Sequence, residues 1–272
     1  MADRGRVAFV LGGGGALGAH EVGMLKALHE AGISPDVVVG TSIGAINGAF
    51  VAADPDKAVE RLAELWAGQA AREAFGAPPW TRLWTLARSG THLHPIGPLC
   101  RTLEEVLPVT DFHDLAVPFQ CVAAGIETAM AHWFAKGPLV PAVLASCAVP
   151  GLLPPVRVGE HHYFDGGLVH SIPVGRAVEL GADTIYVLHV GRIERPLAPP
   201  RWPWEVGMVA FEIARRHRFF EEIATVGDGV RVHVLPAGAT ERQRVPRRPG
   251  GAITFRTERA YQATLDYLER NG

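Results

Sequence analysis

Two short apolar runs, residues 6–11 and 36–39, each end in a glycine-rich turn that passes directly into a helical pattern. The first turn has consecutive glycines at residues 12–15, and the second is Gly40-Thr41-Ser42-Ile43-Gly44. Apolar runs of this length are typical of buried strands, and strands that alternate with helices predict a parallel sheet with helices on both faces. This repeated strand–glycine–helix arrangement constrains the fold more strongly than any other feature of the sequence.

The same alternation continues along the rest of the chain. Helices are expected over residues 19–31, 43–52, 55–67, 138–147, 174–180, 204–226 and 256–270. Strands are expected over residues 118–127, 131–135, 156–164 (a pair around Gly159-Glu160), 184–190 and 230–235. Residues 68–115 show no regular pattern and are expected to be irregular. We therefore predict an α/β fold, a three-layer sandwich with a mostly parallel central sheet.

Glycine is over-represented in this chain. There are 31 glycines among 272 residues, whereas an average usage of ~7% would give about 19. Neither a collagen repeat nor a Gly/Ser linker accounts for the surplus. Each additional glycine therefore predicts a place where the backbone bends sharply or approaches another group closely.

Charge and cysteine content exclude several classes of function. A net charge of −2 argues against nucleic-acid binding through a broad basic surface. Cys100, Cys121 and Cys147 are too few and too widely spaced for a disulfide framework or a zinc site, and they favour a reducing compartment. The 12 histidines show no metal-ligand spacing. We expect a cytoplasmic protein with neither a metal nor another cofactor.

Two uncharged stretches are long enough to be considered as membrane spans. Residues 37–53 are interrupted by glycines and polar side chains, and residues 137–156 contain prolines that a single helix does not accommodate. Near the N-terminus, the apolar run at residues 7–11 is too short for a secretory signal before the glycines begin. We expect neither a membrane span nor a cleaved signal.

The segment Gly40-Thr41-Ser42-Ile43-Gly44 has the G-x-S-x-G pattern at the point where a predicted strand passes into a helix. A sharp turn there lifts the serine hydroxyl above the edge of the sheet, and small flanking residues relieve crowding. An ordinary tight turn can show the same residues, because glycine and serine are common in turns. Ser42 is the candidate nucleophile, with Gly40 and Gly44 as the residues that permit the turn.

Residues 12–18 form the other glycine-rich turn. Backbone N–H groups in such a loop, next to a helix N-terminus, attract an anion, either a phosphate or a developing oxyanion. Gly13, Gly15 and Gly18 also match the G-x-G-x-x-G dinucleotide pattern, but Asp36 begins its strand instead of ending it, and no Gly-Lys-Ser/Thr follows. An oxyanion is favoured because a candidate nucleophile follows the next strand. Nucleotide or phosphate binding remains the alternative function.

Ser42 needs a neighbouring group that accepts its proton. Asp165 is prominent because it ends a predicted strand and is followed by Gly166 and Gly167, a setting that exposes a carboxylate at the sheet edge. Partial burial is expected to raise its pKa above the free value near 3.9, which makes it a better base. Histidines later in the chain could act instead: His170, His189 (expected in the core), His217 (expected in solvent) and His233.

Together these motifs resemble those of the patatin-like phospholipase family. The glycine-rich loop, the G-T-S-I-G turn and the D-G-G at residues 165–167 occur in the family's order. Ala145-Ser146-Cys147-Ala148-Val149-Pro150 is also similar to the family's A-S-x-A-x-P segment. The four motifs cover roughly residues 6–190. The resemblance implies a patatin-like fold and a Ser42–Asp165 dyad, without a histidine, that hydrolyses acyl esters, commonly those of lipids.

The resemblance also implies roles for the loop and for the partners. The N–H groups of Gly13, Gly14 and Gly15 would receive the oxyanion. Leu17 stands where the family often has Arg or Lys, which leaves open how the loop or an anionic headgroup is oriented without that cation. The expected partner is a lipid or acyl-ester substrate, with transient contact with a membrane surface and no nucleic acid. The sequence does not indicate an oligomeric state.

Residues 6–190 are expected to form the catalytic domain. Residues 191–272 are expected to form a helix–strand–helix extension of the same domain, because their strand should join the sheet. Two segments could contact lipid: residues 79–84, rich in proline and tryptophan, and the helix over residues 204–226. That helix carries Phe211, Phe219 and Phe220 together with Arg215, Arg216 and Arg218. For both segments the pattern favours a simpler interpretation, with buried aromatic side chains and a solvated basic face.

Overall fold

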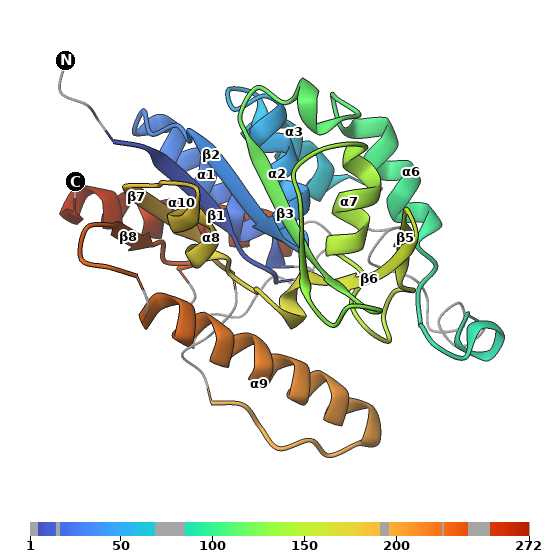
Figure 1. Ribbon diagram of the computed structural model, residues 1–272. Coiled ribbons are helices and arrows are strands. Elements are labelled where there is room, and N and C mark those ends of the chain that lie inside the picture. Colours follow the sequence, from blue (N-terminus) through green and yellow to red (C-terminus); the bar gives the residue numbers. More distant parts are fainter. Residues whose placement is uncertain are drawn as a thin grey trace.

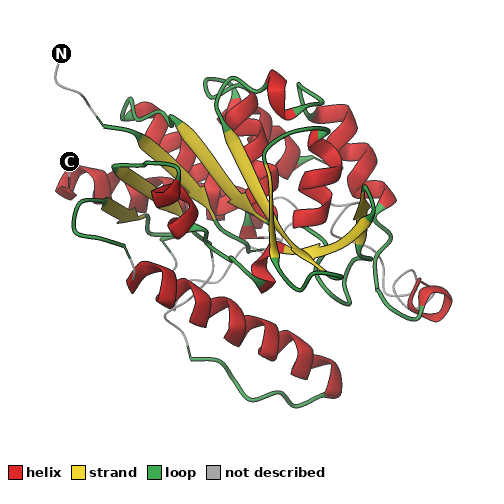
Figure 2. Cartoon of the chain, in the orientation of Figure 1, coloured by secondary structure: helices red, strands yellow, loops and turns green. Residues whose placement is uncertain are grey.

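The computed structural model describes residues 5–14, 17–68, 85–190, 196–224, 226–238 and 251–271 (Figure 1). In this part of the chain the strands form one eight-stranded sheet (Figure 2). The parallel strands lie in the order β3 (Phe119–Gly125), β2 (Val37–Thr41), β1 (Val7–Leu11), β7 (Thr184–Leu188) and β8 (Arg231–Val234). The antiparallel strands are β4 (Ala131–Phe134) and β6 (His161–Asp165), which pair with β3, and β5 (Val156–Val158), which pairs with β6. The predicted α/β fold with a mostly parallel sheet is confirmed.

The central strands are apolar on both faces, as buried parallel strands require. Phe9 and Leu11 of β1 face one core, whereas the alternate residues Ala8 and Val10 face the other. The first core is covered by α1 (Ala19–Glu30), α2 (Ile43–Ala53), α3 (Ala58–Ala67), α6 (Gly97–Val106) and α7 (Leu139–Ser146), with α10 (Gly251–Asn271) packed on α1. The second core is covered by α8 (Val174–Glu179) and α9 (Pro203–Ala224), and α9 stands out from the main body in Figure 1. The predicted three layers are therefore present.

Two predictions about these elements are wrong. Residues 68–115 are predicted to be irregular, yet α6 forms there because Leu99 and Leu103 lie one turn apart and are both buried. The last helix begins at Gly251, earlier than the predicted start at residue 256. The segment at residues 79–84 lies outside the described residues, so neither interpretation of it, lipid contact or the favoured burial of its aromatic side chains, is tested.

Strand β3 brings the ends of β2 and β6 together. Its residue Val122 pairs with Thr41 of β2 on one edge and with β4 on the other. The next residue, Ala123, pairs with β4 and with Asp165 of β6. Strand β6 therefore continues along the edge where β2 stops. Because Ser42 follows Thr41 directly, this register places Ser42 beside Asp165.

The C-terminal part of the chain adds to the opposite side of the sheet. Strand β8 pairs in parallel with β7, as expected for residues 230–235. Helix α10 lies so close to α1 that a Cβ at Gly23 would be 2.1 Å from the carbonyl oxygen of Thr257. The Thr257 hydroxyl also donates a 3.0 Å hydrogen bond to the carbonyl oxygen of Ala19. Strand β8 and helix α10 thus pack directly on elements of the preceding part of the chain.

Candidate active site

Ser42 lies on a sharp turn between β2 and α2. Its backbone has φ 56° and ψ −124°, a conformation that residues other than glycine rarely adopt. A Cβ at Gly44 would lie 2.3 Å from the carbonyl oxygen of Leu11, and one at Gly40 would lie 2.5 Å from the carbonyl oxygen of Gly44. The strained serine and its obligatory small neighbours are the geometry of a nucleophile elbow.

The Ser42 hydroxyl donates a 2.5 Å hydrogen bond to Oδ2 of Asp165. The other carboxylate oxygen, Oδ1, accepts a 2.7 Å hydrogen bond from the N–H of Gly167. The backbone N–H of Ser42 donates to Oγ of Ser146 at 2.9 Å. A Cβ at Gly166 would lie 2.2 Å from a carbonyl oxygen of β3, so the turn after Asp165 also requires glycine. Hydroxyl and carboxylate are thus held together by contacts on both sides.

Burial raises the pKa of Asp165 to about 6. The hydrogen bonds from Ser42 and Gly167 and the nearby guanidinium of Arg215 lower this pKa, but loss of hydration has the larger effect. The predicted rise is confirmed, and the burial behind it is nearly complete, with Asp165 only 1% exposed. At neutral pH the group is therefore a carboxylate that accepts a proton more readily than a solvated aspartate does.

The glycine-rich loop lies beside Ser42, since a Cβ at Gly13 would be 3.4 Å from Cβ of Ser42. The N–H of Gly13 donates to the carbonyl oxygen of Ser171 at 3.1 Å. The prediction that this N–H serves an oxyanion is therefore corrected: the amide is already bonded within the protein. The N–H of Gly14 has no acceptor among the described residues, and Gly14 lines the cleft. Gly15 lies outside the described residues, so its role stays a prediction.

A buried polar network, formed by Glu21, Asn47 and Trp66, supports the far end of the loop. Nδ2 of Asn47 donates to Oε2 of Glu21 at 2.6 Å and to the carbonyl oxygen of Gly18 at 3.2 Å. Oδ1 of Asn47 accepts from the indole N–H of Trp66 at 3.1 Å. Burial raises the pKa of Glu21 well above its usual value. No local sequence pattern indicates this Glu21 network, because its members come from three separate helices.

A cleft of about 830 Å³ opens above the Ser42–Asp165 pair, a volume in the usual range for small-molecule sites. Its floor consists of Gly13, Gly14, Ser42 and Asp165. Its walls are mostly apolar, and they come from Leu17, Val149, Leu152, residues 197–200 and, on α9, Met208, Val209 and Phe211. Besides Asp165, the charged residues that line the cleft are Arg201, Glu205, Glu212 and Arg215.

Arg215 of α9 reaches into the floor of this cleft and is only 7% exposed. Its Nη1 donates to the carbonyl oxygen of Gly13 and to Oγ of Ser171, each at 3.1 Å. Its Nε and Nη2 each donate to the Glu212 carboxylate at 2.8 Å. The predicted solvated basic face is wrong for Arg215. No local pattern could have shown this, since Gly13 and Arg215 are 202 residues apart.

Other side chains of α9 divide between the two interpretations considered for this helix. Phe219 is buried, as the simpler interpretation predicts. Arg218 also follows it, with a side chain that is 51% exposed. Phe220, in contrast, is 55% exposed, whereas the simpler interpretation predicts that it is buried. The outer face of α9 is therefore partly apolar.

No histidine in the ranges that the structure describes takes the place of Asp165 beside the Ser42 hydroxyl. In the described part of the chain, the hydrogen bond of the Ser42 hydroxyl goes to Asp165 and not to an imidazole ring. The histidines considered from the sequence lie elsewhere: His170 beside Glu222, His189 in the core, His217 in solvent and His233 stacked on Tyr186.

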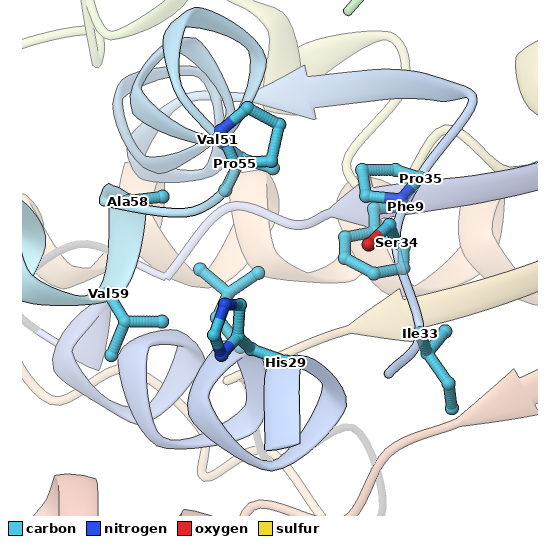
Figure 3. Close-up of a pocket in the computed structure, with 10 residues that line it drawn as sticks. Phe9, His29, Ile33, Ser34, Pro35, Val51, Pro55, Ala58 and Val59 are labelled. Carbon is cyan, nitrogen blue, oxygen red and sulfur yellow. The ribbon is translucent and has the colours of Figure 1, made fainter. Parts of the chain in front are cut away.

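The amino edge of the sheet lacks the features of a second site. Asp36 lies there, at the start of β2, and its Oδ2 accepts a 2.8 Å hydrogen bond from the N–H of Val7. A dinucleotide fingerprint needs its acidic residue at the other end of that strand. A cavity at this edge, lined by residues such as Phe9, His29 and Pro55, has about 20 Å³, room for about one water molecule (Figure 3).

Among the described residues, no group of three His, Cys, Asp or Glu side chains is placed to hold a metal ion. All three cysteines are free thiols, and Cys147 donates a hydrogen bond to the carbonyl oxygen of Ser42 at 3.0 Å. No helix in the described ranges is both long enough and apolar enough to cross a bilayer.

Comparison with known proteins identifies the family. The model of the patatin-like phospholipase family matches residues 9–178. The patatin-like phospholipase domain-containing protein ZK370.4 of Caenorhabditis elegans is 32% identical over 192 residues, which cover 69% of this chain and 14% of that protein. Lysophospholipase nte1 of Emericella nidulans is 34% identical over 197 residues, which cover 69% of this chain and 12% of that protein. The chain therefore belongs to the patatin-like phospholipase family.

This chain is much shorter than those relatives, since the matched region is only 12% and 14% of their lengths. The crystal structure of VipD from Legionella pneumophila aligns with a TM-score of 0.51 at 15% sequence identity. That alignment covers 99% of this chain and 67% of VipD. At this identity the likeness shows a shared fold.

Proposed function

We propose that this chain hydrolyses carboxylic esters of lipids, with Ser42 as the nucleophile and Asp165 as the general base. The proposal rests on one observation, the 2.5 Å hydrogen bond from the Ser42 hydroxyl to the Asp165 carboxylate at the floor of the cleft. A hydroxyl at this distance from a carboxylate can lose its proton as it attacks. Family membership, and the lysophospholipases among the relatives, support a lipid ester as the substrate.

In the first half of the reaction, Oγ of Ser42 attacks the ester carbonyl carbon and its proton passes to Asp165. The carbonyl oxygen becomes an oxyanion, which the N–H of Gly14 receives, with Gly15 as the predicted second donor. One such donor contributes roughly 3 kcal/mol to transition-state stabilisation in comparable sites. Asp165 then gives the proton to the leaving alcohol as the ester C–O bond breaks, and the acyl group remains on Ser42.

In the second half, water attacks the acyl carbon and Asp165 takes a proton from it. The bond between the acyl group and Ser42 breaks, the serine regains a proton, and the carboxylic acid leaves. The apolar walls of the cleft, including Leu152 and Met208, suit an acyl chain, because burying its methylene groups is favourable by about 0.8 kcal/mol each.

The nucleophile is tested by labelling with a fluorophosphonate, which forms a bond to an activated serine oxygen and releases fluoride. We expect the intact protein to be labelled and Ser42→Ala to remain unlabelled. Ser34→Ala, an exposed serine at the amino edge of the sheet, serves as the matched control and should label normally. Absence of labelling in the intact protein contradicts the assignment of Ser42.

The substrate class is tested by hydrolysis of p-nitrophenyl esters, a diacyl phospholipid and a lysophospholipid by the intact protein and Ser42→Ala. Long-chain esters should be cleaved faster than acetate if the apolar cleft binds the chain. The alternative function, nucleotide binding by the glycine loop, predicts a rise in melting temperature with NAD or ATP. Because Asp36 lies at the wrong edge of the sheet, we expect neither nucleotide to stabilise the protein.

We further propose that α9 contacts the lipid surface from which the substrate enters. Val206, Ile213 and Phe220 recur every seven residues, so they share one face of the helix, and each is more than half exposed. Trp202, 57% exposed, lies just before the helix. This apolar stripe adjoins the cleft wall formed by Val209. With a net charge of −2, any such contact has to be local and apolar.

Co-sedimentation with phosphatidylcholine vesicles tests this contact. Ile213→Asp should reduce the bound fraction, because it places a charge in the centre of the apolar stripe. Ala214→Asp introduces the same charge on the same helix, at an exposed position away from the stripe, and should bind as the unaltered protein does. Equal binding by the two variants contradicts a role for the stripe.

We also propose that residues 191–272 belong to the catalytic domain. Strand β8 extends the central sheet beside β7, and α9 supplies part of the cleft wall. A chain that ends at residue 190 would expose the β7 edge and lose that wall. It should aggregate or remain inactive, as measured by gel filtration and ester hydrolysis, whereas a soluble, active fragment would contradict the proposal.

A further inference from the structure

Gly13 is held between two residues from distant parts of the sequence, the backbone of Ser171 and the side chain of Arg215. Its N–H donates to the carbonyl oxygen of Ser171, and its own carbonyl oxygen accepts from Nη1 of Arg215, both at 3.1 Å. The same Nη1 donates to Oγ of Ser171, which closes the arrangement. We call Gly13, Ser171 and Arg215 the Gly13 clamp. Gly13 and Arg215 both line the cleft, as does Ser42.

The hydrogen bonds of Arg215 show that it is not a free binding group for an anionic headgroup. A guanidinium has five N–H donors. Four of the donors of Arg215 are engaged: two by Glu212, one by Gly13 and one by Ser171. The side chain is also almost fully buried, and such a charge is stable only when paired and hydrogen-bonded. Its bonding capacity is therefore used within the protein.

The contact with Gly13 has a consequence for the next amide. The carbonyl group of Gly13 and the N–H of Gly14 belong to one planar peptide unit, in which C=O and N–H point in opposite directions when the bond is trans. No described peptide bond is cis. When Arg215 fixes the direction of the Gly13 carbonyl, it also fixes the direction of the Gly14 N–H, which has no acceptor among the described residues.

We infer that Arg215 is a positioning residue: by binding the Gly13 carbonyl oxygen it orients the Gly14 N–H toward the oxyanion. This inference rests on the proposed function, because an oxyanion arises only if Ser42 attacks an ester. It also places a cation from α9 beside a loop whose own described residues at this point, Gly13, Gly14 and Leu17, carry no charge.

Helix α9 has other anchors, so removal of the Arg215 side chain should not detach it. Glu222 pairs with Nδ1 of His170 at 2.5 Å and accepts from the N–H of Gly175 at 3.2 Å. Phe219 is buried in the second core. A substitution at Arg215 should therefore act locally on the loop, which allows the functional effect to be separated from loss of folding.

The test compares Arg215→Met, Arg215→Lys and Arg218→Met in steady-state ester hydrolysis across pH. Arg218 is on the same helix and half exposed, so its replacement controls for the change in net charge. We expect Arg215→Met to lower kcat about 10- to 100-fold with little change in KM, and to move the acidic limb of the pH profile upward, since Arg215 lowers the pKa of Asp165. Arg215→Lys should return the acidic limb to its position in the unaltered protein, because the positive charge is kept, but should recover only part of kcat.

The outcomes separate this inference from the proposed function. If the unaltered protein hydrolyses esters and Arg215→Met matches Arg218→Met within twofold, the positioning role is overturned while the function stands. If Arg215→Met loses kcat with an unmoved acidic limb and a lower melting temperature, its role is structural and the inference fails. If the unaltered protein neither hydrolyses esters nor reacts with a fluorophosphonate, the proposed function itself fails.

Discussion

Two buried carboxyl groups lie near the glycine-rich loop, and their surroundings differ in kind. Asp165 and Glu21 are 1% and 0% exposed, and burial raises the pKa of both. Asp165 accepts a hydrogen bond from a hydroxyl at the floor of a cleft. Glu21 accepts one from the Asn47 amide, within a network that ends at an indole and a backbone carbonyl. Burial therefore raises the basicity of both carboxyl groups. The hydrogen-bonding partner of each group and its access to the cleft determine whether it can take part in a reaction.

The largest expected difference between these regions is in catalysis. Asp165→Asn removes the proton acceptor and should lower kcat/KM for a p-nitrophenyl ester by at least about 10³-fold. Glu21→Gln keeps the size of the side chain and an oxygen that can accept the hydrogen bond from Asn47, so it should stay within about threefold of the unaltered protein. The measurement is steady-state hydrolysis, with circular dichroism to show that both variants fold. Comparable losses in the two variants would mean that the buried network, and not the Ser42 partner, governs the chemistry.

The pH dependence of hydrolysis should separate the two carboxyl groups next. Asp165 must be ionised to accept a proton, and its pKa is about 6. The value of kcat/KM should therefore fall about tenfold per pH unit below pH 6 and level off above it. Glu21→Gln should leave this limb in place, because Glu21 has no contact with the reacting groups. If the fall in kcat/KM below pH 6 moves in Glu21→Gln, or is absent in the unaltered protein, the two carboxyl groups do not differ in the way proposed.

Features of the site that depend on local sequence patterns could be predicted from the sequence. Strands and helices near the site were predictable because apolar runs and glycine turns are local signals, as at Gly40 and Gly44. The positions of Ser42 and Asp165 at the ends of strands were predictable because glycine-containing turns follow both residues in the sequence. Helix α6 was missed although Leu99 and Leu103 are correctly spaced for one buried face, since prolines and aromatic residues just upstream obscured the pattern.

The contacts that complete the site were not predictable, because they join residues far apart in sequence. Arg215 looks like one of several arginines on an amphipathic helix, and only its distance to Gly13 distinguishes it from Arg218. The same holds for the bond between Gly13 and Ser171, which changes the predicted role of an amide in the loop. Sequence patterns locate reactive side chains, whereas the packing of separate elements determines which backbone donors remain available.

Stability should respond to Asp165 in the opposite sense to activity. Its folded-state pKa, about 6, is above the ordinary value of 3.8, so its ionisation opposes folding. The stability it contributes is present below pH 3.8 and is lost as pH rises through 6. Asp165→Asn should therefore be more stable than the unaltered protein by about 3 kcal/mol at pH 8, with no such gain at pH 3.5.

Urea unfolding at the two pH values measures this difference. Glu21→Gln should show a gain of the same sign, growing with pH, because burial raises the pKa of Glu21 as well. The two variants would then share an effect on stability while differing in activity. A gain in Asp165→Asn that is equal at both pH values would show that ionisation is not its cause.

The smallest expected effects concern the two ends of the glycine-rich loop. A Cβ at Gly18 would lie 2.6 Å from the Trp66 ring and 2.8 Å from Cγ1 of Ile43, both in the buried core. Gly18→Ala should therefore cost about 1–3 kcal/mol of stability through overpacking. A Cβ at Gly13 would meet Cβ of Ser42 at 3.4 Å, an ordinary contact, so Gly13→Ala should change stability by less than about 0.5 kcal/mol.

Activity should rank these two variants the other way. The methyl group of Gly13→Ala would lie in the cleft beside Ser42, where it would compete with the substrate carbonyl for space, so kcat/KM should fall about tenfold. Gly18→Ala should keep kcat/KM within about threefold at a temperature where it is folded. Urea midpoints and ester hydrolysis of both variants provide the comparison. If Gly18→Ala loses activity without losing stability, the Glu21 network shapes the oxyanion site directly, and the two regions act as one.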